Sequence, residues 1–171
     1  ESVVVGDPKA EETTMGPVVS EVQFNKIQGL IQAGIDEGAK LVCGGVGRPE
    51  GLDSGYFIKP TVFSNVNNDM TIAREEIFGP VLVMMPYDSL EEAIAVANDT
   101  PYGLAGYVQG NNNDEILEVA AQIRAGNISI NGGSGDLHTP FGGYKQSGNG
   151  REWGAHGFTD YLEVKALSGA A

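Results

Sequence analysis

Residues 74–81, REEIFGPV, lead directly into the apolar run 81–85, VLVMM, and the rest of the chain is interpreted around them. Two adjacent carboxylates, Glu75 and Glu76, come first, and Phe78 follows just before a Gly-Pro turn. This turn predicts a sharp change of direction before the strand. A carboxylate and an aromatic ring are therefore expected at the mouth of a strand, where a loop on a rigid scaffold carries function. From spacing alone, the pattern favours a simpler interpretation, an acidic helix end followed by a buried strand.

Outward from this stretch, the apolar periodicity predicts alternating helices and strands. Helices are predicted after Ser20, at 69–74, at 89–98, after Asn112 or Asn113, and within 151–158. Strands are predicted at 40–43, 56–63, 81–85, 104–108, 127–131 and 161–167. The alternation indicates right-handed βαβ crossovers in a mainly parallel sheet. A Gly-rich loop then reaches residue 150, and loops of that length in compact domains are usually functional.

The spacing of apolar residues also predicts which faces are buried. In the first helix the inward positions, three and four residues apart, are Phe24, Ile27, Ile31 and Ile35. In the helix after Asn112 or Asn113 they are Ile116, Leu117, Ala120 and Ile123. The nearly continuous apolar run 81–85 predicts a strand that is buried on both faces of a parallel sheet.

Composition restricts the class of protein. The 171 residues carry 23 acidic and 10 basic side chains, a formal net charge of −13, which argues against a nucleic-acid or anionic-membrane partner. One cysteine cannot form an internal disulfide and suits a reducing, cytoplasmic location. The chain begins at Glu1 without a signal pattern, so we expect a fragment or processed product whose targeting region is not visible.

Four segments together resemble the NAD(P)-dependent aldehyde dehydrogenase superfamily. They are 55–62, GYFIKPTV; 75–81, EEIFGPV; 101–105, PYGLA; and 140–152, PFGGYKQSGNGRE. They occur in the order typical of the family, and with the connecting segments the resemblance covers essentially the whole chain. It implies an α/β, three-layer αβα catalytic domain with a mainly parallel sheet, the C-terminal part of a protein that also has a Rossmann-type cofactor domain.

The resemblance also implies the activity and the site residues. Family members oxidise an aldehyde to a carboxylic acid with NAD or NADP. Glu76 matches the carboxylate that holds the nicotinamide ribose, and Phe78 matches the aromatic residue beside the nicotinamide. Asn131 and Phe141 fall where the family lines its aldehyde tunnel, although loop packing explains them equally well. Glu75 is expected to form a structural salt bridge.

No catalytic residue is expected within this chain. The family's nucleophile lies in a Gly-Gln-x-Cys segment that this sequence lacks, and the general-base segment is also missing. The chain alone is therefore predicted to be inactive. Cys43 is predicted to be a buried structural residue, since no motif surrounds it. His138 and His156 have no partners at metal-ligand spacing, so no metal site is predicted.

The predicted organisation is a partial catalytic domain over residues 1–160 and a C-terminal strand and tail over 161–171. Family members are commonly dimers or tetramers, so the resemblance implies a homo-oligomer that uses this strand. Two alternatives stay open. The isolated chain could be a non-catalytic folded or oligomerisation module, or the parent could be a relative that makes an acyl thioester or reduces an acyl phosphate.

Overall fold

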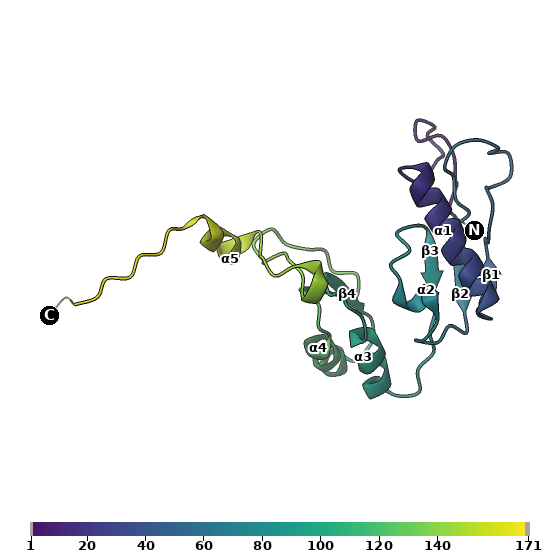
Figure 1. The fold of residues 1–171 in the computed structure, drawn as a ribbon. Helices are drawn as coiled ribbons and strands as arrows, with labels where there is room; N and C mark the ends of the chain where they lie inside the picture. Colours follow the sequence, from purple (N-terminus) through teal and green to yellow (C-terminus); the bar gives the residue numbers. More distant parts are fainter. Residues whose placement is uncertain (1, 170–171) are drawn as a thin grey trace. The chain divides into compact units, whose positions relative to one another are not determined.

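The computed structural model describes residues 2–169, which form two compact units. The first unit is Glu1–Pro86 and the second is Tyr87–Ala171. Each contains its own helices and its own sheet, and both have α/β character. Figure 1 shows the elements coloured along the chain.

The first unit is organised around helix α1, Glu21–Asp36. Ser20 caps it as predicted, because its side chain accepts a hydrogen bond of 3.2 Å from the Gln23 amide. Phe24, Ile27 and Ile31 are buried as predicted, but Ile35 is 36% exposed. Gly34 takes the inward place instead, and a side chain there would collide with Ile72 and Phe63.

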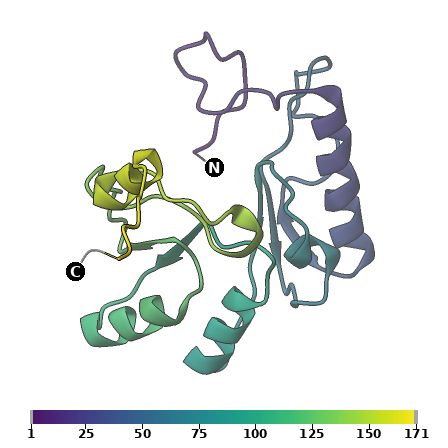
Figure 2. The same cartoon turned by 60° about the vertical axis from the view of Figure 1, so that its left-hand side comes forward.

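A three-stranded sheet lies against α1, in the order β1-β2-β3 (Figure 2). The strands are β1, Lys40–Cys43; β2, Thr61–Ser64; and β3, Val81–Val83. β1 pairs with β2 antiparallel, and β2 pairs with β3 parallel. The predicted strand at 56–63 is shortened and begins only at Thr61, because Pro60 has no N–H to donate to the ladder.

β3 is less buried than its apolar sequence predicts. Leu82 is 58% exposed and Met84 is also exposed, so the expectation of burial on both faces is wrong for this unit. β3 and β1 are edge strands, each paired on one side only, and α1 covers one face of the sheet. The core instead gathers under α1, around the fully buried Phe63 of β2.

The second unit contains a βαβ crossover. Strand β4, Ala105–Val108, leads through α4, Asn113–Gln122, to β5, Asn127–Ile130, and the two strands pair in parallel. Helix α3, Leu90–Asn98, precedes them, capped by the Ser89 side chain as predicted.

Asn112, rather than Asn113, is the cap of α4. Ile116 is the buried residue of this helix, whereas Leu117 is 59% exposed, which corrects its predicted inward position. Leu117 follows Ile116 directly and lies about 100° further round the helix, and in this unit only the side that carries Ile116 is covered.

The last part of the chain holds three short helices. They are the 3₁₀ turn η1, Lys145–Ser147; α5, Gly154–Phe158; and the 3₁₀ turn η2, Thr159–Tyr161. The strand predicted at 161–167 is absent, since residues 162–169 form no regular structure. A strand needs a neighbour for its backbone hydrogen bonds, and no described strand pairs with this segment.

Across residues 2–169, no helix is both long and apolar enough to cross a membrane.

Candidate functional site

The 75–80 loop connects helix α2, Thr71–Arg74, to β3, and both of its ends are fixed. The Glu75 amide donates to the Thr71 carbonyl at 2.9 Å and closes the helix. At the other end, the Thr61 amide donates to the Pro80 carbonyl at 2.9 Å and joins the loop to β2. The predicted short helical turn followed by a Gly-Pro turn and a strand is therefore confirmed.

Helix α1 holds the middle of this loop through two polar side chains. The Gln23 side-chain amide donates to the carbonyls of Ile77, at 3.0 Å, and Phe78, at 2.9 Å. The Lys26 ammonium donates to the Glu76 carbonyl at 2.8 Å. Ile77 belongs to the buried core cluster, so its side chain also anchors the loop.

The two predicted cofactor residues lie on the exposed side of this loop. The Glu76 side chain is exposed, and its carboxylate forms no hydrogen bond or ion pair with residues 2–169. Phe78 is 71% exposed, which is unusual for so large an apolar ring. Its backbone also has a φ of 53°, a conformation that residues with a side chain rarely adopt. The Glu76 carboxylate, which can accept hydrogen bonds, and the exposed Phe78 ring therefore lie two residues apart.

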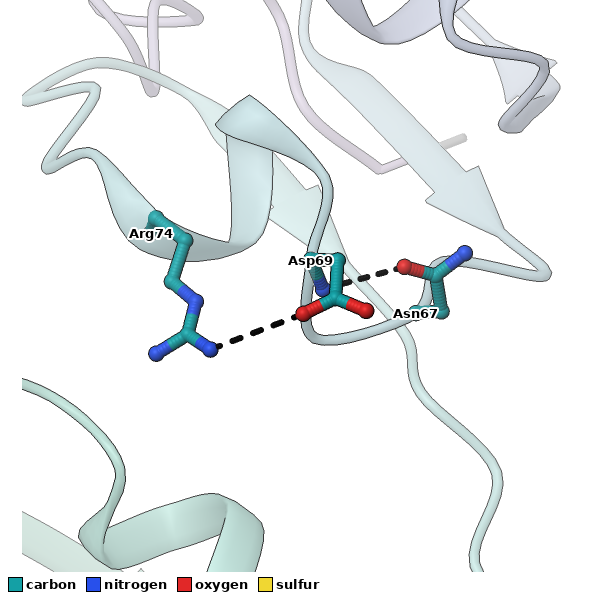
Figure 3. A network of polar contacts seen from close by, with 3 residues as sticks. All are labelled: Asn67, Asp69 and Arg74. Carbon is teal, nitrogen blue, oxygen red and sulfur yellow. Dashed lines mark hydrogen bonds and ion pairs between the residues drawn. The ribbon is translucent and has the colours of Figure 1, made fainter.

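The predicted salt bridge of Glu75 is wrong for the described residues. The carboxylate found beside Arg74 is that of Asp69, 3.8 Å away and five residues earlier in the chain (Figure 3). The Asp69 backbone amide in turn donates to the Asn67 side chain at 3.0 Å. Glu75 is exposed and forms no ion pair within residues 2–169.

Phe141 lies in the second unit, at the edge of a cavity of about 280 Å³. Its backbone pairs with that of Glu152 through two hydrogen bonds, 2.8 and 2.7 Å long. Its ring packs on Trp153, with the ring centroids 5.0 Å apart. Besides Phe141, the cavity is lined by Leu104, Ser147, Arg151, Glu152, Asp160 and four glycines.

Asn131 does not line that cavity. Its side chain instead bonds twice to Gly110: its oxygen accepts from the Gly110 amide at 3.0 Å, and its nitrogen donates to the Gly110 carbonyl at 3.1 Å. Both polar ends of the amide thus have partners at the end of β4. The substrate-binding assignments of Asn131 and Phe141 stay predictions, and the contacts of Asn131 support its structural interpretation.

Cys43 is exposed, which corrects its predicted burial. It lies on β1, an edge strand whose four residues are all exposed. Its sulfur is 4.0 Å from the Pro60 carbonyl oxygen. The described residues also contain no group of three His, Cys, Asp or Glu side chains that could hold a metal ion.

Sequence reasoning missed three residues. Gln23 and Lys26 are polar, and their spacing on α1 is typical of a solvent-facing helix surface. Trp153 lies just outside the apolar patterns and has a φ of 63°. The available signal for Gln23 and Lys26 was their position beside the inward Phe24 and Ile27, at the margin of the buried face.

Comparison with known proteins identifies the family. The model of the aldehyde dehydrogenase family matches residues 1–167, and the chain belongs to this family. It is 56% identical over 167 residues to the 3-succinoylsemialdehyde-pyridine dehydrogenase of a Pseudomonas species, a match that covers 98% of this chain and 35% of that protein. A putative aldehyde dehydrogenase of Staphylococcus haemolyticus is also 56% identical over the same shares of the two chains.

Solved structures show the same similarity. Aldehyde dehydrogenase C of Pseudomonas syringae, in complex with NAD+ and octanal, is 55% identical with a TM-score of 0.93 over 97% of this chain and 34% of that one. A Mycobacterium tuberculosis aldehyde dehydrogenase in complex with NAD+ is 52% identical, with a TM-score of 0.89 over 94% of this chain and 33% of that one. The chain therefore spans about a third of the length of these relatives.

Proposed function

We propose that this chain is the C-terminal, catalytic-domain part of an enzyme that oxidises an aldehyde to a carboxylic acid with NAD+. The observation that carries the proposal is the 75–80 loop, which presents the unpaired Glu76 carboxylate and the exposed Phe78 ring. Family membership and two NAD+-bound relatives in the same fold support it. In the complete protein, the two sheets described here belong to a three-layer αβα domain.

The residues of the loop fit a nicotinamide nucleotide. A carboxylate can accept hydrogen bonds from two ribose hydroxyls at once, and such charge-assisted bonds are the strong ones. The Glu76 carboxylate makes no contact with residues 2–169 that would compete for these hydroxyls. Phe78 offers an apolar face to a flat ring. The bound nucleotide would supply the hydride acceptor, and these two side chains would orient it.

Phe141 and Trp153 are proposed as one wall of the aldehyde tunnel. Phe141 lines the 280 Å³ cavity, Trp153 packs on its ring, and the two apolar rings suit an apolar aldehyde tail. The octanal in the Pseudomonas syringae relative supports an apolar substrate. We further propose that the protein is cytoplasmic, which the free thiol of its single cysteine supports. We also propose that it forms a homo-dimer or homo-tetramer, which the exposed apolar side chains near residue 167 support.

The test replaces Glu76 by Gln in the complete protein, which keeps the size of the side chain and removes its charge. A hydrogen bond to a charged group contributes about 1.5–3 kcal/mol. We therefore expect kcat for NAD+-dependent aldehyde oxidation to fall by roughly 10- to 100-fold. The primary deuterium isotope effect on hydride transfer should grow, while the Kd for NAD+ should rise only modestly, because most of the dinucleotide is held elsewhere.

Glu75→Gln is the matched control, since Glu75 is the adjacent, equally exposed carboxylate. It should leave kcat within about twofold of the wild type, as surface substitutions usually do. A Glu76 variant with wild-type kcat and an unchanged isotope effect would remove the proposed role. Greater sensitivity at Glu75 would do the same. If the complete protein oxidises no aldehyde with NAD+ at all, the chain is better explained as a folded, non-catalytic module.

A further inference from the structure

We propose that Gln23 is a positioning residue that holds Phe78 in its unusual backbone conformation and so aims the Phe78 ring. The proposal rests on the function proposed above, because the ring is assigned there to the nicotinamide. It concerns a side chain in a different element, more than fifty positions earlier in the chain.

The Gln23 side chain forms hydrogen bonds with the backbone on both sides of Phe78. The carbonyls of Ile77 and Phe78 flank the backbone of Phe78, and the single side-chain amide of Gln23 donates to both, at 3.0 and 2.9 Å. That amide has two N–H donors, one for each carbonyl. In an extended chain, successive carbonyls point to opposite sides of the backbone, so one donor group could not reach both. The shared donor therefore favours a bent backbone at Phe78.

The bent backbone at Phe78 needs contacts that hold it in place. A φ of 53° is costly for a residue with a Cβ, and strained residues of this kind persist only where their surroundings hold them. The Phe78 ring cannot supply that support through burial, because it is 71% exposed. The holding contacts come from α1 instead.

Neighbouring residues of α1 complete the arrangement. Lys26, three residues after Gln23, donates to the Glu76 carbonyl at 2.8 Å. Ile27, four residues after Gln23, is fully buried and fills the space beside Gly79. Positions three and four apart lie on one face of a helix, so α1 presents one continuous surface to loop residues 76–79. Gln23 is the member of this surface that bonds to both sides of Phe78.

The test is made in the complete protein with Gln23→Met, which keeps the length of the side chain and removes both donors. Gln32→Met is the matched control, because Gln32 is exposed on the same helix and donates to Asp36 rather than to the loop. The first readout is a crystal structure without nucleotide. We expect Phe78 to leave the positive-φ region or lose its order in the Gln23 variant, and to keep both in the Gln32 variant.

The second readout is kinetic. Gln23→Met should lower kcat about 3- to 10-fold and raise the primary deuterium isotope effect, while the Kd for NAD+ changes less than about threefold. The third readout combines the substitutions. If Gln23 acts through Phe78, adding Gln23→Met to Phe78→Ala should cause no further loss of kcat, because residues that act as one unit are not additive.

Three outcomes would overturn the inference. An unchanged Phe78 backbone in the Gln23 variant removes the positioning role, and so does a fully additive double variant. A Gln23→Met enzyme that matches Gln32→Met in kcat, while Phe78→Ala is impaired, removes the role of Gln23 and leaves the proposed function standing. A Phe78→Ala enzyme with normal kcat and a normal isotope effect removes the function assigned to Phe78, and the inference falls with it.

Discussion

Gly79 has no side chain, and the space that a methyl group would take is already filled by Ile27. A Cβ added at Gly79 would lie 2.5 Å from one carbon atom of Ile27 and 2.9 Å from another. Because Ile27 is fully buried in the core, it has little room to move away. The close approach of the 75–80 loop to α1 thus depends on this one glycine.

We expect Gly79→Ala to lower the free energy of unfolding by about 1–3 kcal/mol, the usual cost of overpacking a core. Gly29→Ala is the matched control, since Gly29 is exposed on α1 and an added Cβ would meet nothing within 4 Å. That control should stabilise the helix by about 0.5–1 kcal/mol. Thermal unfolding followed by circular dichroism would compare the two, and equal or greater stability of Gly79→Ala would contradict the prediction.

Single residues also show where sequence reasoning reaches its limit. The turn after Phe78 was predictable because it is a local property of the chain, whereas spacing alone favoured a simpler interpretation of Glu76 and Phe78. The exposure of Cys43, Leu82 and Ile35 did not, because burial depends on whether another element covers a face. The contribution of Gln23 depends on a contact between residues 54 and 55 positions apart, which no local pattern reports.

Among the elements, the end of α3 and the turn η1 are joined by one charged side chain. The Lys145 ammonium donates to the carbonyls of Asn98, at 2.8 Å, and Thr100, at 3.1 Å. A cation near the C-terminus of a helix also interacts favourably with the helix dipole. Lys145 itself has a φ of 55°, so its own backbone is held in an uncommon conformation.

We expect Lys145→Met to lower the free energy of unfolding of the second unit by about 1–2 kcal/mol, because two partly buried carbonyls lose a charged donor. Fluorescence of Trp153, the single tryptophan, can follow denaturant unfolding of that unit. Lys165→Met is the control, since Lys165 is exposed in a segment without regular structure. A similar unfolding midpoint for both variants would show that the bonds to Asn98 and Thr100 do not contribute.

Element boundaries were largely predictable from local signals. Ser20, Ser89 and Asn112 each cap a helix through their side chains, and Gly38 follows α1 with a φ of 89°. The predicted strand at 161–167 failed for a non-local reason. Its composition suits a strand, but a strand forms only where another backbone is available to pair with it.

For the chain as a whole, residues 161–167 are a strongly exposed apolar segment. Tyr161, Val164 and Leu167 are between 85% and 95% exposed. We expect the chain to self-associate through this segment, because pairing would both bury these side chains and complete the backbone hydrogen bonds. Sedimentation velocity would compare the whole chain with a version that ends at Asp160, and the shorter chain should be the smaller species.

Val164→Pro gives a sharper version of this experiment, because proline removes a backbone donor within the segment. Glu163→Ala is its control, since it keeps the backbone intact. Loss of association in the proline variant alone would support strand pairing. A whole chain that stays monomeric at high concentration would contradict the prediction.

The side chain of Asn131 has a consequence for how this architecture can change over evolution. The Asn131 side chain bonds to both backbone polar groups of Gly110 and so ends the β4–β5 ladder. The backbone turns away from the strand at Asn131 itself, which has a φ of 48°. The strand end is thus satisfied before the long loop begins. Substitutions at Ser134 and Gly135, which form no hydrogen bond with the strands among residues 2–169, can then accumulate without exposing unpaired groups of the sheet. This part of the loop could therefore diverge while the scaffold beneath it stays the same.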